Sequence, residues 1–292
     1  MIQFTKSVYK HYKCSMKEVT RVIENKASGE NLEIMNKYVD FYWENNMIPF
    51  EEDSRHEFKC HRNLSVEELP PWTQENQKRT RRSVSRTLNA FLNTGQGGSV
   101  YLGVADDGKI IGLQLTLFQR DHLKVNLDNL MKRYIPQVDL NRYGIHFMPV
   151  ISRTVSMADV YRICNKIKLE SDIFSKEERQ RSHLCQSYAR CWCDEQAAMM
   201  VKADEVIHRF VVEIHIKPWD PKTMIWNNIV PGINLHPMHA NEEGRVFMKT
   251  LAGVKLCDDQ DIINITVKDV KQIFQTRINN IKKKIEALKT DN

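Results

Sequence analysis

The segment 88–112 constrains the fold more than any other part of this 292-residue chain. It predicts the end of a helix, a turn built on Gly95, Gly97 and Gly98, and then an almost continuous apolar strand over residues 99–104. An uninterrupted apolar strand is typical of a strand buried on both faces of a sheet. The Asp-Asp-Gly-Lys run that follows predicts a tight hairpin turn and a return strand. We therefore expect the domain to be organised around this buried strand.

The chain divides into three predicted parts. Residues 1–50 predict a mostly helical N-terminal extension, because their apolar side chains recur at helical spacing. Residues 51–265 predict the main domain. Within it, residues 152–208 are charged and free of glycine, and they predict a helical insertion because the segment is too long for a plain loop. Residues 266–292 predict a basic C-terminal helix.

Periodicity within the main domain predicts the remaining elements. Apolar runs indicate strands at 57–60, 144–151, 209–217 and 243–249, and spacing of three to four residues indicates helices at 73–93 and 119–135.

The C-terminal helix carries a heptad-like apolar seam. Thr266 is a plausible N-cap, and the seam follows at a spacing of four and three residues, at Phe274, Ile278, Ile281, Ile285 and Leu288. Two interpretations are open for this seam: packing on the chain's own domain, or coiled-coil pairing with another chain.

Composition excludes several classes of protein. The apolar and charged contents, 41% and 27%, are those of a globular domain, and no apolar run is long enough to span a membrane. The N-terminal residues lack the apolar core of a secretory signal. The odd number of cysteines, seven, argues against a disulfide framework and predicts reduced thiols in the cytoplasm.

The chain is mildly basic, with a formal net charge of +6, and its positive charge is clustered. Five cations fall within nine residues: Lys78, Arg79, Arg81, Arg82 and Arg86. Such a cluster suits a polyanion such as nucleic acid, although a solvated helix face has the same pattern.

The order of these motifs resembles the Schlafen family. Residues 90–98 (AFLNTGQGG) and 103–108 (GVADDG) are similar to the family's glycine turn and strand end, and Glu57-Phe58-Lys59 is similar to the family's preceding EFK. The similarity covers roughly residues 51–248 apart from the insertion. It implies an α+β fold, in which a mixed β-sheet is flanked by helices, with the insertion and the terminal helices added.

The resemblance also implies a function on RNA. Several vertebrate members are endoribonucleases that cut transfer RNA with two glutamates, an aspartate and a divalent metal. Related nematode proteins assemble into an enzyme that trims the 5′ ends of piRNA precursors. The corresponding carboxylates here are Glu52, Glu57 and Asp106. Long family members carry two such lobes and this chain has one, so we expect a second Schlafen-like chain, identical or paralogous, to complete the substrate groove.

The residue types at these positions are consistent with that chemistry. Three carboxylates suit Mg²⁺ or Mn²⁺ and leave positions open for water and a phosphate oxygen. Lys59 lies on the same strand face as Glu57 and is placed to stabilise charge on the phosphate. The alternative is that these carboxylates belong to solvated acidic turns.

The insertion holds a second candidate metal site. His183, Cys185, Cys191 and Cys193 provide the imidazole and thiolates of a structural zinc site. The family's own zinc-binding His-x-Cys pair would fall at His146, where methionine replaces the cysteine two positions on. Buried free cysteines are the alternative.

These observations predict a metal-dependent endoribonuclease, or the catalytic subunit of one, that processes small or precursor RNA. The alternative from a different class is a non-catalytic RNA-binding or scaffold subunit. A DNA-binding regulator is a weaker third interpretation, since it has no need for the three carboxylates.

Overall fold

The computed structural model describes residues 40–70, 83–173, 176–220, 235–251 and 253–290. Contacts divide the chain into residues 1–40 and 41–292, and every element given below belongs to the second unit. The extension predicted at residues 1–50 therefore lies mostly outside the described residues. Within the described ranges, no helix is both long and apolar enough to cross a membrane.

The main sheet is mixed, which confirms the predicted α+β class. It consists of β1 (Tyr42–Trp43), β2 (His56–Lys59), β3 (Gly98–Leu102), β4 (Leu113–Gln114), β5 (Tyr143–Ile151) and β6 (Arg209–Ile216). The order is β1-β5-β6-β3-β2, with β4 paired to β6. β1 runs parallel to β5 and β2 parallel to β3, whereas β6 is antiparallel to β3, β4 and β5.

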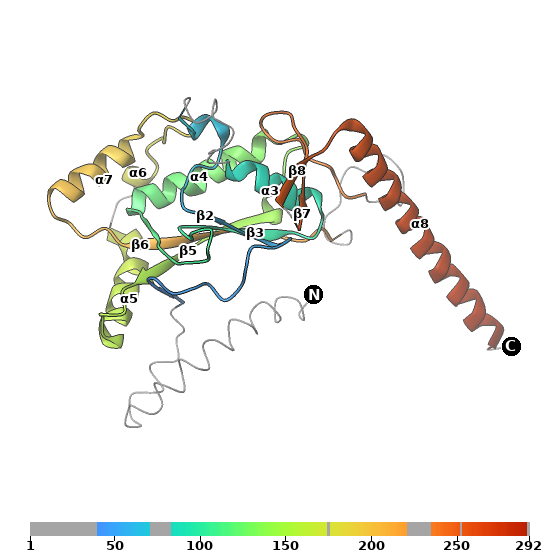
Figure 1. The fold of residues 1–292 in the computed structure, drawn as a ribbon, viewed down its shortest axis with the longest axis horizontal. Helices are drawn as coiled ribbons and strands as arrows, with labels where there is room; N and C mark the ends of the chain where they lie inside the picture. Colours follow the sequence, from blue (N-terminus) through green and yellow to red (C-terminus); the bar gives the residue numbers. More distant parts are fainter. Residues whose placement is uncertain (1–39, 71–82, 174–175, 221–234, 252, 291–292) are drawn as a thin grey trace, which may run out of the picture. The chain divides into compact units, whose positions relative to one another are not determined.

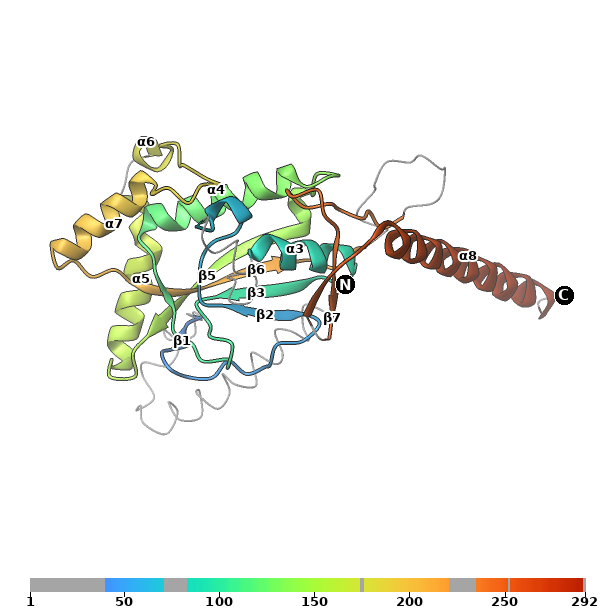
Figure 2. The same ribbon diagram turned by 45° about the horizontal axis from the view of Figure 1, so that its top comes forward.

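Two helices cover one face of this sheet, α3 (Val84–Asn93) and α4 (Leu117–Arg133) (Figures 1 and 2). Their apolar side chains and those of β3 and β6 form one core cluster, in which Phe91, Leu127 and Val212 are completely buried or nearly so. Because side chains alternate along a strand, Val100 and Leu102 face this core and Ser99 and Tyr101 face the other side.

The helical insertion is confirmed between β5 and β6. It consists of α5 (Met157–Ile173), α6 (Lys176–Arg179) and α7 (Trp192–Lys202). Two short 3₁₀ turns, Val66–Glu68 and Leu140–Arg142, and the hairpin β7 (Phe247–Thr250) and β8 (Gly253–Leu256) complete the domain before α8 (Asp259–Thr290).

The glycine turn before β3 allows the chain to pass closely over the end of β6. Gly97 has a φ of +69°, and a Cβ at this position would lie 2.3 Å from the carbonyl oxygen of Ile216. No side chain fits there, so the turn explains why the sequence requires glycine at this point.

Two predicted boundaries are corrected. Tyr42 and Trp43, expected to be helical, form β1, because this short aromatic pair hydrogen-bonds alongside β5. α8 begins at Asp259, where Asp258 accepts a hydrogen bond from the Asp261 amide at 2.7 Å. Thr266 therefore lies inside the helix and is not its cap, and its hydroxyl donates to the Ile262 carbonyl four residues back.

Candidate functional site

The carboxylate of Glu57 lies between two lysines. Its Oε1 accepts a hydrogen bond from Lys59 Nζ at 2.6 Å, and its Oε2 accepts one from Lys249 Nζ on β7. Glu57 is paired in register with Val100, so its side chain lies on the core face of the sheet, where Lys249 also approaches the ring of Phe91. Burial raises the pKa of Glu57, but the two lysines outweigh burial and bring the pKa below its usual value. Glu57 is therefore ionised at neutral pH.

Glu52 lies next to Glu57 along the edge of the sheet. Its Oε1 accepts a hydrogen bond of 2.6 Å from the backbone amide of Phe58. β2 is the last strand in the sheet order, so this contact also satisfies an outward-facing amide on an edge strand. The contact gives Glu52 a structural role at the edge of the sheet.

Asp106 lies in the exposed turn that follows β3. β3 pairs with β2, and the Gly103 amide donates to the Lys59 carbonyl at 2.7 Å, so the turn begins beside the end of β2. The negative charge of Asp106 is close enough to Cys60, which follows Lys59, to contribute to a raised pKa of its thiol, whose main cause is burial. The Glu52 contact and the Asp106 turn thus both lie beside β2, the strand that carries Glu57.

These three carboxylates do not form a ready metal site. In the described part of the chain, the one group of three or more His, Cys, Asp or Glu side chains able to hold an ion lies elsewhere. Both oxygens of Glu57 are bonded to lysines, and one oxygen of Glu52 is bonded to the backbone. In this arrangement the three carboxylates do not fit a divalent ion, and we derive no catalytic step through one.

The predicted basic cluster is only partly described. Lys78, Arg79, Arg81 and Arg82 lie outside the described residues. Arg86 forms a two-pronged ion pair with Glu243, at 2.7 and 2.8 Å, and this carboxylate raises the pKa of Arg86. The Arg86 guanidinium is therefore engaged within the domain.

The group that could hold a metal ion is made of two histidines and two cysteines: His122, His183, Cys191 and Cys193. One potential ligand atom from each lies within 4.8 Å of the others. Cys191 Sγ is 3.6 Å from His183 Nδ1, and Cys193 Sγ is 3.6 Å from His122 Nδ1. Two imidazoles and two thiols in one compact group match the donor set of a tetrahedral zinc site.

The cluster joins the insertion to the main domain. His122 comes from α4, His183 from the loop after α6, and both cysteines from the start of α7. Burial, with a contribution from nearby Arg62, lowers the pKa of His122 to about 4, so its imidazole is neutral and able to act as a ligand. Burial raises the pKa of the Cys193 thiol. A bound cation would offset that cost of forming the thiolate.

Sequence reasoning identified three members of this cluster and missed the fourth. Cys185 is not among the four; its thiol lies beside Asn129 of α4, seven residues or two helical turns from His122. His122 takes the fourth position from the main domain. The available signal was its place on α4 directly before Leu123, one of the buried apolar residues of that helix.

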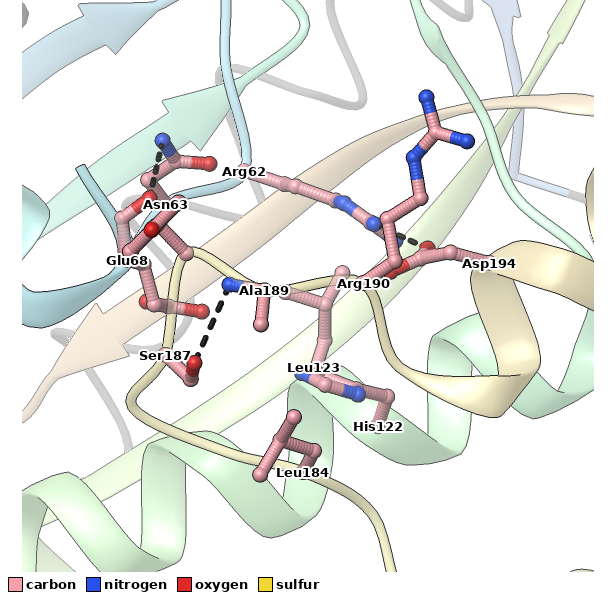
Figure 3. A pocket seen from close by; sticks show the side chains of 11 residues that line it. Arg62, Asn63, Glu68, His122, Leu123, Leu184, Ser187, Ala189, Arg190 and Asp194 are labelled. Atoms are coloured by element: carbon pink, nitrogen blue, oxygen red, sulfur yellow. Dashed lines mark hydrogen bonds and ion pairs between the residues drawn. The ribbon is translucent and has the colours of Figure 1, made fainter. Parts of the chain in front are cut away.

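A cavity of about 290 Å³ adjoins the cluster. Figure 3 shows His122 and Asp194 at its wall, together with Arg62 from the segment after β2 and Glu68 from the first 3₁₀ turn. Asp194 accepts hydrogen bonds from Arg62 and from Gln119 of α4, the latter at 2.7 Å. The Asp194 carboxylate thereby fixes the start of α7, and with it both cysteines, against α4.

Comparison with known protein families gives a match within the main domain. Residues 52–190 match the family model described as Schlafen, AlbA_2. The matched region begins at Glu52, contains the other two predicted carboxylates and both histidines of the cluster, and ends one residue before Cys191. The family includes members that act on nucleic acids.

Proposed function

This chain carries a Schlafen-like domain of the AlbA_2 type, and on that premise we propose that it is the catalytic subunit of a ribonuclease that processes small or precursor RNA. The observation that carries the proposal is the Glu57 carboxylate held between Lys59 and Lys249. An ionised carboxylate can act as a general base, and ammonium groups can stabilise the negative charge that develops on a phosphate during cleavage.

The two lysines connect RNA binding to the state of Glu57. A phosphate of the RNA backbone competes with Glu57 for the ammonium groups, because both are anionic acceptors of charge-assisted hydrogen bonds. Once a phosphate engages Lys59, the Oε1 atom of Glu57 is released. Lys59 then stabilises negative charge that develops on the phosphate.

We include dependence on Mg²⁺ or Mn²⁺ in the proposal. It requires that a lysine first leave Glu57, so that a carboxylate oxygen becomes available to the ion. While both lysines remain in place, Glu57 has no free oxygen to offer a divalent ion. Binding of the substrate, or of a second Schlafen-like chain that closes over the site, would move the lysines away from Glu57. We therefore expect activity to depend on the assembled complex more than on the isolated chain.

A cleavage assay with labelled RNAs and Mn²⁺ tests the proposal, on the chain alone and with its co-purified partners. Glu57→Gln should lower the cleavage rate at least about a hundredfold, in line with the loss of a group that acts in proton transfer or charge stabilisation. Glu51→Gln is the matched control, since Glu51 is an exposed neighbouring carboxylate, and it should cleave like wild type. Folded Glu57→Gln protein with full activity would refute the catalytic role.

A second function, a non-catalytic RNA-binding or scaffold subunit, is favoured by one specific observation. The three carboxylates form no group able to hold an ion, and Glu57 is already neutralised by lysines. On this alternative, the complex loses RNA binding when the chain is omitted but cleaves normally with the Glu57→Gln subunit. The same assay therefore separates the two functions.

The proposal extends to zinc in the His/Cys cluster. The ion would be held by His122, His183, Cys191 and Cys193 and would stabilise the insertion by tying α7 to α4. Metal analysis of the purified chain should find one zinc per chain. Cys193→Ser should lose it and Cys185→Ser should retain it; zinc retained in Cys193→Ser, or absent from the wild type, contradicts this assignment.

A further inference from the structure

The second half of α8 exposes an apolar seam. Phe274, Ile278, Ile281 and Ile285 recur at spacings of four, three and four residues, and they are between 44% and 57% exposed. The side chains from Phe274 to Lys289 are all exposed, so nothing in the described domain covers this seam. A repeated apolar stripe of this kind on a long helix is typical of an interaction surface.

The spacing assigns each residue a position in a coiled-coil heptad. Ile278 and Ile285 fall at position a, and Phe274 and Ile281 fall at position d, where they would insert into a partner helix. The stripe is only two positions wide in each heptad, because polar residues flank it on both sides. This narrow seam indicates pairing with one helix, and a broad helix face would instead be needed to pack on a domain core.

The positions that flank the seam are all basic or neutral. Arg277 and Lys284 occupy position g, and Lys282 and Lys289 occupy position e. In a parallel pair of two copies, position g of one helix faces position e of the next heptad in the other, so Arg277 would meet Lys282 and Lys284 would meet Lys289. In an antiparallel pair, g faces g and e faces e, and the contacts are again between cations. Self-association therefore meets charge repulsion in either orientation.

We propose that α8 pairs through this seam with an acidic amphipathic helix of a different chain. Its partner presents an apolar a/d seam flanked by glutamate or aspartate at e and g. Each exposed pair of opposite charges is worth roughly a twofold gain in affinity, and each like-charged pair a similar loss. Four flanking cations give roughly a tenfold preference for an acidic helix over a neutral one, and a larger preference over a basic one.

Two designed peptides test the charge rule on the full chain. Both carry the same Ile/Leu seam over four heptads; one has glutamate at every e and g position, and the other has lysine. Fluorescence anisotropy should show the acidic peptide binding one to one and at least about tenfold more tightly than the basic one, with the difference shrinking in 1 M salt as screening increases. Equal binding of the two peptides, or no binding of either, would overturn the proposal.

Paired variants locate the interaction on the seam. Ile278→Asp/Ile281→Asp should abolish binding of the acidic peptide. Lys284→Glu should weaken it severalfold, whereas Lys283→Glu, the same charge change one position away on the outer face of the helix, should alter it by less than about twofold. An equal effect of Lys283→Glu and Lys284→Glu would show a diffuse charge attraction and would contradict the register.

The pairing of charges between positions g and e also predicts a variant that associates with itself. Arg277→Glu/Lys284→Glu makes position g acidic while position e stays basic, so that two copies become complementary in parallel. Light scattering should find this variant shifted toward a dimer at concentrations where the wild type shows no association through α8. A wild-type dimer that dissociates on Ile281→Asp would overturn the proposal. A second result would also overturn it. If RNA binding depends on Lys282 and Lys284 but is unaffected by Ile278→Asp/Ile281→Asp, α8 is a nucleic-acid-binding surface.

Discussion

The Glu57–Lys249 ion pair gives the sharpest expectation about stability. The side chain of Lys249 is 3% exposed and that of Glu57 is 14% exposed, so both charges are nearly withdrawn from water. Lys249→Met removes the ammonium group but keeps a side chain of similar length. Glu57 then stays buried with Lys59 as its remaining partner.

The expected loss follows from the cost of leaving a buried charge short of a partner. Breaking a buried pair from one side typically costs 3–5 kcal/mol, and the remaining contact with Lys59 places this case at the lower end, at about 3 kcal/mol. For a domain of this size, about 1 kcal/mol corresponds to roughly 2–4 °C, so the melting temperature should fall by about 6–12 °C.

A double-mutant cycle separates this pair from general packing. Glu57→Gln/Lys249→Met removes both charges of the pair and leaves the Lys59 ammonium, which is 16% exposed and also bonded to the Phe58 carbonyl, and we expect its stability to exceed that of Lys249→Met by about 1–2 kcal/mol. Urea unfolding of the four proteins measures the cycle. Lys255→Met is the control, because its ion pair with Asp261 is solvent-exposed, and its unfolding midpoint should match that of wild type.

Two results would refute the reasoning. If Lys249→Met unfolds like wild type, the ammonium group contributes nothing that methionine does not replace. If the double variant is no more stable than Lys249→Met, the loss comes from packing around the side chain and not from the unpaired carboxylate. Either result would also weaken the proposed competition between RNA phosphate and Glu57 for these lysines.

Three further expectations follow from buried contacts. Burial raises the pKa of Glu68 from 4.5 to about 7, so between these pH values the folded state keeps a proton that the unfolded state loses. The contribution of Glu68 to the free energy of unfolding therefore falls by about 3 kcal/mol as pH rises from about 4.5 to 7. Glu68→Gln should flatten that part of the pH–stability curve, measured by urea unfolding. Asn93→Ala should cost about 3 kcal/mol in the same assay, because the buried Asn93 amide bonds two backbone carbonyls and one backbone amide, at 2.7–3.0 Å. Gly97→Ala should prevent stable folding, because its Cβ would lie 2.3 Å from a backbone oxygen, and soluble yield and melting temperature measure this effect. Gly244→Ala is the control: its φ of +71° is similar but no atom lies within 4 Å of the added Cβ, so it should cost only about 1 kcal/mol. Equal effects at the two glycines would show that backbone strain, and not the clash, decides the outcome.

Local pattern was sufficient for the elements whose physics is local. The apolar run at β3, the glycine turn before it and the spacing on α3 and α4 each predicted an element that the structure confirms. The boundaries of helices and strands were harder to predict where the same residues suit both a helix and a strand. The aromatic pair Tyr42–Trp43 suits a helix or a strand, and only its pairing with β5 decides for the strand.

The candidate sites also contain some residues that local sequence motifs identify and others that only the tertiary structure identifies. The sequence alone was enough to name Glu52, Glu57, Asp106 and Lys59 as candidates, because they lie in contiguous or nearly contiguous motifs, and their catalytic role stays a prediction. Lys249 was not anticipated, since it lies 192 residues from Glu57 and reaches it only when β7 packs against α3. His122 was missed for the same reason, because it joins three residues of the insertion from a helix about sixty residues away in sequence.

The sequence by itself determined which residue types are available and which segments become helices and strands, because these follow from side-chain periodicity and turn chemistry. Only the tertiary structure decided which charges meet. A carboxylate acts as a metal ligand, a partner of lysine or a cap for a strand edge according to the groups that burial brings within about 3 Å of it. That choice depends on contacts between distant segments, which no local pattern records.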